Sequence, residues 1–221
     1  MQKTCLKITL KLKNLDQAKD LALQDLQRIC ENAGKRLSKI GLPEPVGYTD
    51  TMYQTKEMRR ETTAYDSSAE LRMAQSSREK MYPDQASLYD AITKAVDEGT
   101  GGIFFADGPG GSGKTFVETA LLHYVRGGER VALACAWSGV AATLLEGGRT
   151  CHSTFGFPVP MPRENVPSSI SAQSGRAEVL REASFIVWDE APMSPKEAAT
   201  AADTLLQEVC GVYDPFARKT V

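Results

Sequence analysis

A glycine-rich loop in the middle of the chain has the spacing of a phosphate-binding loop. It fits the pattern GxxxxGK[ST] with eight consecutive residues: Gly108, Pro109, Gly110, Gly111, Ser112, Gly113, Lys114 and Thr115. Glycines let backbone N–H groups approach a triphosphate without Cβ clashes, and the positive end of a following helix adds to the attraction. The Lys114 ammonium can reach the β- and γ-phosphates for binding and catalysis, and the Thr115 hydroxyl can ligate Mg²⁺. The loop therefore predicts ATP and Mg²⁺ as cofactors.

A pair of carboxylates follows an apolar run farther along the chain. Residues 184–188 are followed at once by Asp189 and Glu190. Ligands of an open parallel sheet bind beyond the carboxyl ends of its strands, so a strand here would bring Asp189 to the same rim as the loop. Asp189 can then hold Mg²⁺ through water, and Glu190 can orient or deprotonate an attacking water as a catalytic residue. A solvated acidic pair before Pro192 is the alternative that spacing alone leaves open.

The elements that must position these residues alternate between strand and helix. Short apolar runs predict buried strands at residues 103–106, 131–136 and 184–188. Helical spacing predicts helices from Pro83 to the glycines near residue 99, over about 114–126, from about 139, and over 195–210. Almost wholly apolar strands between helices indicate an α/β fold with a parallel sheet flanked by helices on both faces.

The first 80 residues carry weaker signals. Apolar residues at helical spacing predict a helix from Leu15 to Ala33, and two prolines, at 43 and 45, forbid its continuation. Residues 46–80 are polar and weakly periodic, which predicts a linker or a partly helical arm without its own core. We therefore divide the chain into an N-terminal helical segment and linker, residues 1–80, and a nucleotide-binding domain, residues 81–221.

Composition excludes several classes of protein. The chain has 221 residues, of which 42% are apolar and 24% charged, as in globular proteins, and no apolar run is long enough to cross a bilayer. The net charge of -2 lacks the basic excess of many nucleic-acid binders, so any DNA contact must be local. The five cysteines are scattered and show no CxxC spacing, which argues against a zinc site and against a secreted disulfide framework.

Five motifs occur in an order that is similar to one family. They are residues 81–85 (MYPDQ), the glycine-rich loop, residues 136–142 (AWSGVAA), residues 149–153 (RTCHS) and residues 188–193 (WDEAPM). Together they resemble the first motifs of the PIF-type (petite integration frequency) DNA helicases, and the WDEAPM form is most similar to the helicase part of Helitron transposon proteins. The resemblance covers residues 81–221 well and 15–46 loosely. It implies the N-terminal part of an ATP-dependent helicase that moves 5′ to 3′ on single-stranded DNA, with a RecA-like first motor domain.

The resemblance also implies roles outside the two catalytic motifs. Gln85 would read the adenine of ATP, although Met81-Tyr82 stands where the family usually has Leu-Asn. Ser138 and Gly139 fall where the family grips the DNA backbone, and a hydroxyl with a free N–H suits a phosphate. Trp137 departs from the small residue usual there, so that it either crowds the strand or offers a stacking face.

The resemblance places the dipeptide His152-Ser153 near the DNA path, while a structural histidine is the alternative reading. It places Thr220 and Val221 where the family's next strand begins, so we expect a first motor domain that is incomplete at its C-terminus and a second domain beyond it. For these 221 residues we expect ATP binding, weak binding of single-stranded DNA and very slow turnover, because the arginine finger belongs to the second domain.

Two other readings remain open. One is an isolated ATP-binding module or transposon remnant without helicase activity, and the other is a different P-loop NTPase such as a kinase or a AAA-type remodeller. The family further implies a nuclear location, with mitochondria as the alternative, and roles in DNA repair, DNA recombination and telomere maintenance.

Overall fold

A computed structural model describes residues 23, 26, 37–43 and 55–221, in two compact units, Met1–Gln54 and Thr55–Val221. Within the first unit it describes the short 3-10 helix η1, Leu37–Ile40, in which Leu37 is buried. The predicted helix over residues 15–33 lies outside the described residues except for Leu23 and Leu26, both of which are helical. None of the helices in the described residues is long and apolar enough to span a membrane. The functional motifs all lie in the second unit.

The second unit is built on a parallel sheet with the strand order β2-β1-β3. The central strand β1, Val131–Ala136, is buried at all six positions and lies between β2, Arg149–Thr150, and β3, Ala183–Asp189. Its last residue, Ala136, is in register with Asp189 on β3 and with Thr150 on β2. The parallel register therefore brings the carboxyl ends of all three strands to one edge, as the sequence predicts.

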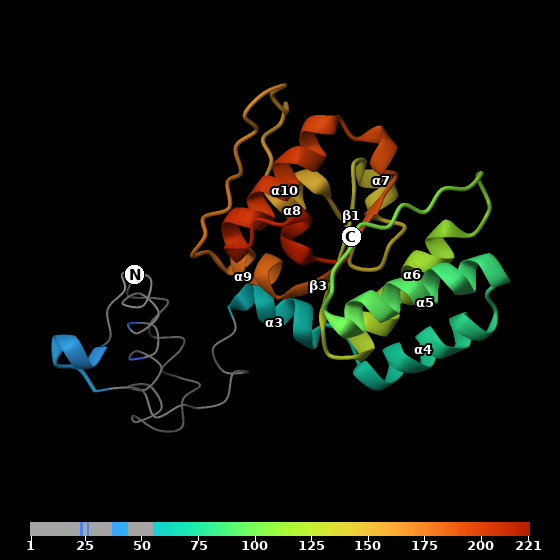
Figure 1. Ribbon diagram of the computed structural model, residues 1–221, viewed down its shortest axis with the longest axis horizontal. Helices are drawn as coiled ribbons and strands as arrows, with labels where there is room; N and C mark the ends of the chain where they lie inside the picture. Colours follow the sequence, from blue (N-terminus) through green and yellow to red (C-terminus); the bar gives the residue numbers. More distant parts are fainter. Residues whose placement is uncertain (1–22, 24–25, 27–36, 44–54) are drawn as a thin grey trace. The chain divides into compact units, whose positions relative to one another are not determined.

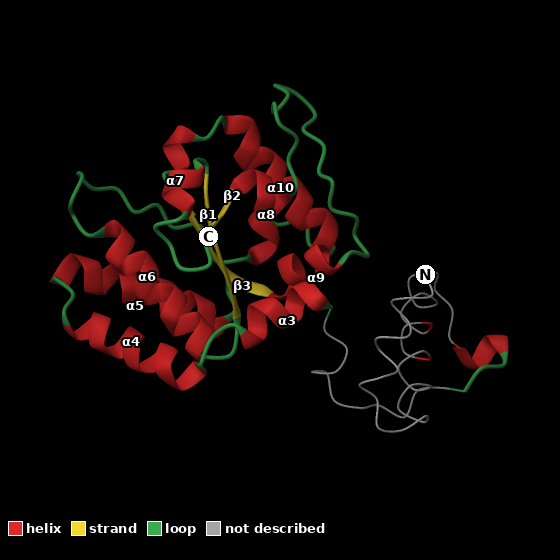
Figure 2. Ribbon diagram, turned by 180° about the vertical axis from the view of Figure 1, so that it is seen from behind, coloured by secondary structure: helices red, strands yellow, loops and turns green. Residues whose placement is uncertain are grey.

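Helices cover both faces of this sheet, which confirms the predicted α/β class. On one face Ala132, Ala134 and Phe185 pack with α5, Pro83–Glu98, and α6, Lys114–Gly127. On the other face Leu133 and Ile186 pack with α9, Gly175–Glu182, and α10, Lys196–Cys210. Figures 1 and 2 show the two helix layers on opposite sides of the strands. Alternate residues of each strand thus enter opposite cores, which explains why the strands are apolar throughout.

The ends of α5 and α10 follow ordinary stop signals. Gly99 and Gly211 each adopt the left-handed conformation that closes a helix, with φ of 61° and 68°. Pro83 occupies the first turn of α5, where its missing N–H leaves no hydrogen bond unmade. The predicted helices over residues 83–98, 114–126 and 195–210 are therefore confirmed to within a few residues.

The polar segment before residue 80 forms two helices, α3, Lys56–Thr63, and α4, Ser67–Glu79. The side chains of Thr55 and Asp66 cap them by accepting hydrogen bonds from Met58 N and Ala69 N. Met58 belongs to the core beside the sheet, and α4 packs along α6. The two helices have no separate hydrophobic core, as the composition predicts, and they pack against the core of the sheet domain. The domain division after residue 80 stays a prediction.

The run at residues 103–106 is not a strand in the structure, which corrects the prediction. Gly102 and Phe104 make three main-chain hydrogen bonds with Lys219 and Val221, and Thr220 bridges them to Phe185 of β3. Ile103 and Phe105 are 60% and 70% exposed, whereas a buried strand would cover both side chains. The run leads directly into the glycine-rich loop.

The remaining described elements are short; the first three follow the carboxyl ends of β1, β2 and β3, and the fourth follows α10. They are α7, Gly139–Ala142; α8, Cys151–Phe155; η3, Ala191–Met193; and η4, Pro215–Arg218. Residues 157–174 have no helix or strand, and α9 begins at Gly175. The three described cysteines, Cys135, Cys151 and Cys210, are free thiols.

Candidate ATP site and DNA-facing edge

The glycine-rich loop wraps around the Lys114 side chain at the start of α6. Lys114 Nζ donates hydrogen bonds to Gly108 O at 2.6 Å and Pro109 O at 3.3 Å. Gly111 and Gly113 adopt φ of 80° and 82°, which only glycine tolerates without strain. A Cβ on Gly108 would lie 2.8 Å from Ser112 Oγ, so the loop is also close-packed there. The loop therefore has a backbone that requires glycine and a lysine held among main-chain carbonyls, where a phosphate would compete for it.

Gln85 connects the first turn of α5 to the glycine-rich loop. Its Nε2 donates to Ser112 O at 2.9 Å, while its Oε1 accepts from Tyr82 N at 3.0 Å. A Cβ on Gly113 would lie 2.6 Å from this Nε2. The structure thus places Gln85 beside the loop, with both ends of its amide engaged by the backbone. An adenine contact would require the amide to exchange these partners, and that role stays a prediction.

Asp189 and Glu190 lie at the carboxyl end of β3, the position expected from the sequence. Asp189 is 9% exposed, and its Oδ1 accepts a hydrogen bond from Glu190 N at 2.8 Å. Glu190 is exposed and has φ of 52° and ψ of 35°, a left-handed conformation that is costly for a residue with a side chain. Backbone strain of this kind concentrates at functional sites. The bend turns Glu190 away from the strand direction, whereas Asp189 stays at the sheet edge.

A third carboxylate, Glu118, belongs to this group. It lies on α6 one turn after Lys114, and its Oε2 is buried without a hydrogen-bond partner among the described residues. Burial raises the pKa of Glu118 to about 7; the negative charge of Asp189 adds to the rise, and Lys114 opposes it. Sequence analysis missed Glu118, although its spacing of four from Lys114 and three from Thr115 places all three on one helical face.

Ser138 and Gly139 follow β1 at the same edge of the sheet. The Ser138 hydroxyl accepts a hydrogen bond from Ala141 N at 3.1 Å and so caps α7. Gly139 is exposed, with no atom within 4 Å of where a Cβ would lie. Ser138 therefore has a structural role in this structure, while the surface at Gly139 is open. A DNA contact by either residue stays a prediction.

His152 and Ser153 lie on α8, directly after β2. The His152 ring packs against Trp137, with centroids 4.5 Å apart and an angle of 45° between the planes. Both rings are half-buried, and Ser153 is exposed. Ser153 O accepts a hydrogen bond from the Arg176 guanidinium, and Ser153 N donates to Thr150 Oγ1 at 3.1 Å. The ring pair thus brings the segment after β1 into contact with the segment after β2.

Comparison with known proteins identifies the family to which this chain belongs. A sequence model of the family described as PIF1-like helicase matches residues 80–221, which include every site residue discussed above. The chain belongs to the PIF1-like helicase family. The match begins at residue 80, so α3 and α4 lie outside it.

Individual relatives agree with this family. The ATP-dependent DNA helicase Pif1 of Bdellovibrio bacteriovorus is 31% identical over 129 residues, which cover 58% of this chain and 27% of that protein. A crystal structure of Pif1 helicase from Bacteroides in complex with ADP-AlF3 and single-stranded DNA matches with 27% identity and a TM-score of 0.50, over 60% of this chain and 30% of the other. The chain thus spans about a third or less of the length of these relatives.

A further solved structure shares the fold alone. It is a Pif1 helicase structure on DNA unwinding at forked duplex DNA, which matches with a TM-score of 0.51 and 23% identity over 64% of this chain and 32% of that one. The agreement confirms the predicted RecA-like domain of the PIF1 type, with a parallel sheet between helices. The other P-loop classes considered, the kinases and AAA-type remodellers, are not supported.

Proposed function

We propose that this chain is the ATP-binding first motor domain of an ATP-dependent DNA helicase that couples ATP hydrolysis to 5′–3′ movement and unwinding. The observation that carries the proposal is a glycine-rich loop closed around Lys114, in a chain of the PIF1-like helicase family. Lys114 and Asp189, at the carboxyl end of β3, both lie close enough to Glu118 for their charges to shift its pKa. The relatives named above are a DNA helicase and a helicase in complex with a nucleotide analogue and single-stranded DNA. ATP hydrolysis coupled to DNA binding would explain both the glycine-rich loop and the acidic pair of this chain.

Each residue of the proposed ATP site has a role that its chemistry permits. Lys114 would leave the carbonyls of the loop and bind the β- and γ-phosphates. Thr115 would ligate Mg²⁺ directly, and Asp189 would hold it through water. Glu190 would orient the attacking water from the strained bend after β3. Gln85, which already contacts the loop, would bind the adenine.

The proposed DNA path crosses the carboxyl ends of β1 and β2. Gly139 and Ser153 are exposed there, and the half-buried Trp137–His152 pair offers aromatic surface on which a base can stack. The Ser138 hydroxyl already accepts the hydrogen bond that caps α7, so it would contact DNA while it keeps this bond. A nuclear location, with mitochondria as the alternative, and roles in repair, recombination and telomere maintenance are proposals that rest on the family alone.

The test measures Mg²⁺-ATP binding by titration calorimetry, with and without a single-stranded oligonucleotide. Lys114→Ala removes the partner of the β- and γ-phosphates, so we expect its affinity to fall ten-fold or more, about 1.4 kcal/mol or above. We expect the oligonucleotide to change the ATP affinity of the unaltered chain, because a motor couples its two ligands. Equal ATP binding by the Lys114→Ala variant would refute the ATP site. Binding of ATP with no response to DNA would instead favour the isolated ATP-binding module.

A further inference from the structure

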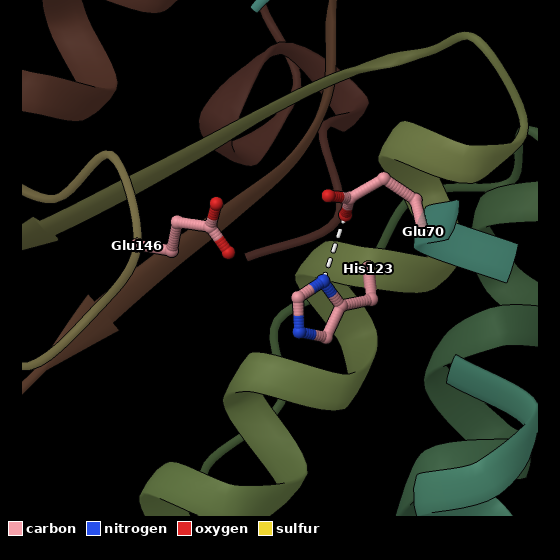
Figure 3. Close-up of side chains that lie close together, drawn as sticks. All are labelled: Glu70, His123 and Glu146. Carbon is pink, nitrogen blue, oxygen red and sulfur yellow. Dashed lines mark hydrogen bonds and ion pairs between the residues drawn. The ribbon is translucent and has the colours of Figure 1, made fainter. Parts of the chain in front are cut away.

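Three ionisable side chains from separate elements converge on the side of α6 remote from the ATP site. They are Glu70 on α4, His123 on α6, and Glu146 in the turn before β2. Each offers one potential ligand atom, and these atoms all lie within 4.8 Å of one another. Figure 3 shows the Glu70 carboxylate against the imidazole, with the Glu146 carboxylate directed toward both from the opposite side. None of the three is used by the proposed ATPase chemistry.

Two of the three side chains are buried, so an uncompensated charge on them would cost free energy of folding. The side chains of His123 and Glu70 are 9% and 6% exposed, and His123 Nδ1 lies 2.7 Å from Glu70 Oε2. Within the described part of the chain, neither Glu70 nor Glu146 has a lysine or arginine paired with its carboxylate. Two carboxylates so close repel each other unless a cation lies between them. The charge of Arg126 acts on Tyr65 together with the charges of Glu70 and Glu146, so this guanidinium lies near the cluster without pairing with either carboxylate.

The third ligand is on a fixed backbone although its side chain is exposed. Glu146 O accepts a hydrogen bond from Arg126 Nη2 at 2.9 Å, and the neighbouring Leu145 is buried at 2% exposure. Arg126 in turn stacks over the Tyr65 ring at 4.0 Å. Arg126 therefore holds the main chain of the turn and leaves the Glu146 carboxylate free to rotate toward His123. A carboxylate on an anchored backbone is a suitable metal ligand.

The donor set identifies the kind of cation. One imidazole nitrogen and two carboxylates suit a first-row divalent transition metal, and sites with three protein ligands and a water are common for Zn²⁺. Ligand atoms about 2.1 Å from a tetrahedral ion lie about 3.4 Å apart. The exposed Glu146 carboxylate, now within 4.8 Å, would rotate closer, and the 2.7 Å contact between His123 Nδ1 and Glu70 Oε2 would lengthen. Solvent reaches the cluster at the exposed Glu146, and an open hollow lined by His123, by α4 residues such as Arg72 and by Lys80 borders the imidazole.

We propose that Glu70, His123 and Glu146 form a binding site for a divalent transition-metal ion, with Zn²⁺ as the probe. The ion would take the place of the hydrogen bond between His123 Nδ1 and Glu70 Oε2, and the displaced proton would move to Nε2 or to solvent. It would tie α4, which lies outside the family match, to the P-loop helix and to the turn that leads into the motif at 149–153. The site contains no cysteine, and it would bind the ion whether or not the chain acts in a helicase.

The experiment is a calorimetric titration of the 221-residue chain with zinc chloride, without nucleotide or magnesium. We expect one ion per chain, and at least ten-fold weaker binding by Glu146→Gln, which removes one ligand and keeps the buried Glu70–His123 pair. Glu208→Gln, a change at an exposed position on α10, is the matched control and should bind as the unaltered chain does. Zn²⁺ should also raise the melting temperature of the unaltered chain more than that of Glu146→Gln.

A second variant and a second metal distinguish this site from the thiols. His123→Asn keeps a hydrogen-bonding side chain beside Glu70 and should lose Zn²⁺ binding as Glu146→Gln does. The visible spectrum of the Co²⁺ complex should show no sulfur-to-cobalt charge-transfer band. Absence of Zn²⁺ binding, equal binding by Glu146→Gln, or a thiolate band with Co²⁺ would each overturn the proposal.

Discussion

At the scale of single residues, Glu190 combines an exposed carboxylate with a strained backbone. It follows Asp189, whose carboxylate accepts the Glu190 N–H, and its φ of 52° is one that few residues with a side chain adopt. Such strain persists only where the surrounding structure enforces it. We therefore expect the pair to divide its work, with Asp189 holding the proposed metal ion and Glu190 orienting the attacking water.

Glu190→Gln is expected to change turnover and not binding. The amide keeps the size of the side chain but cannot accept a proton, and a general base contributes about 10²–10⁴-fold to a rate. In a version of the chain joined to a second motor domain, phosphate release should fall about 100-fold or more while Mg²⁺-ATP affinity stays within about two-fold. Phosphate release at the unaltered rate would remove Glu190 as the base.

Glu118 is expected to make stability depend on pH. Burial and Asp189 raise its pKa to about 7, above the value of about 4.3 for an unfolded glutamate. Below pH of about 4.3 both states are protonated, so the full stability is present. Between that pH and about 7 the unfolded chain loses its proton first, and folded stability falls.

The measurement compares urea unfolding at pH 5 and pH 8 without nucleotide or magnesium. Glu118→Gln should lose less stability than the unaltered chain between these two values, because its amide does not titrate. Glu208→Gln, on the exposed side of α10, should follow the unaltered chain. The same pH dependence in all three proteins would show that Glu118 is not the group responsible.

At the scale of elements, α4 and α6 lie unusually close at Gly127. A Cβ built there would lie 2.7 Å from Leu71 Cγ and 2.8 Å from Leu71 N, so a backbone atom of α4 is in the way. Such contacts are too short for real side chains, and one helix would have to shift. The close approach is what places Glu70 of α4 beside His123 of α6.

Gly127→Ala is therefore expected to destabilise the fold. Overpacking costs about 1–3 kcal/mol, and the better helix propensity of alanine offsets up to about 1 kcal/mol of this. We expect a net loss of about 1–2 kcal/mol in chemical unfolding. Gly139→Ala, where a Cβ would meet nothing within 4 Å, serves as the control and should stay within about 0.5 kcal/mol. A neutral Gly127→Ala would mean that α4 is not held against α6.

At the scale of the whole molecule, charge limits how these residues can hold DNA. The net charge is -2, and the arginines near the proposed DNA path already have partners: Arg149 pairs with Glu61, and Arg176 donates to Ser153 O. Little counterion release is therefore available to drive binding. Any DNA contact has to come from a few local groups at the carboxyl edge of the sheet.

We accordingly expect weak, salt-sensitive binding of single-stranded DNA by the 221-residue chain. Two or three phosphate contacts predict a slope of about -1.4 to -2.1 when the logarithm of the binding constant is plotted against that of the salt concentration. Fluorescence anisotropy with a labelled oligonucleotide at several salt concentrations measures this slope. Tight binding that does not change with salt would contradict it and point to stacking as the main source of affinity.

The sequence alone predicted those features whose residues lie close together along the chain. The glycine-rich loop, the helix from Lys114, strand β1 and the pair Asp189-Glu190 are each specified by residues within one element, because backbone conformation, helical spacing and strand burial act locally. The parallel order of the strands then follows from the alternation with helices. The predicted elements, the parallel sheet and the family are confirmed, while the chemical roles of the loop and of the acidic pair stay predictions.

Tertiary structure decided what depends on residues far apart in the sequence. The run at 103–106 reads as a strand, yet its pairing ends at Phe104 because a strand needs a partner that local sequence does not specify. The apparent linker before residue 80 becomes two helices because α6 and the sheet supply the apolar surface that it lacks. Glu118 beside Asp189, and Glu70 beside His123, are separated by 71 and 53 residues respectively, so only packing could bring them together.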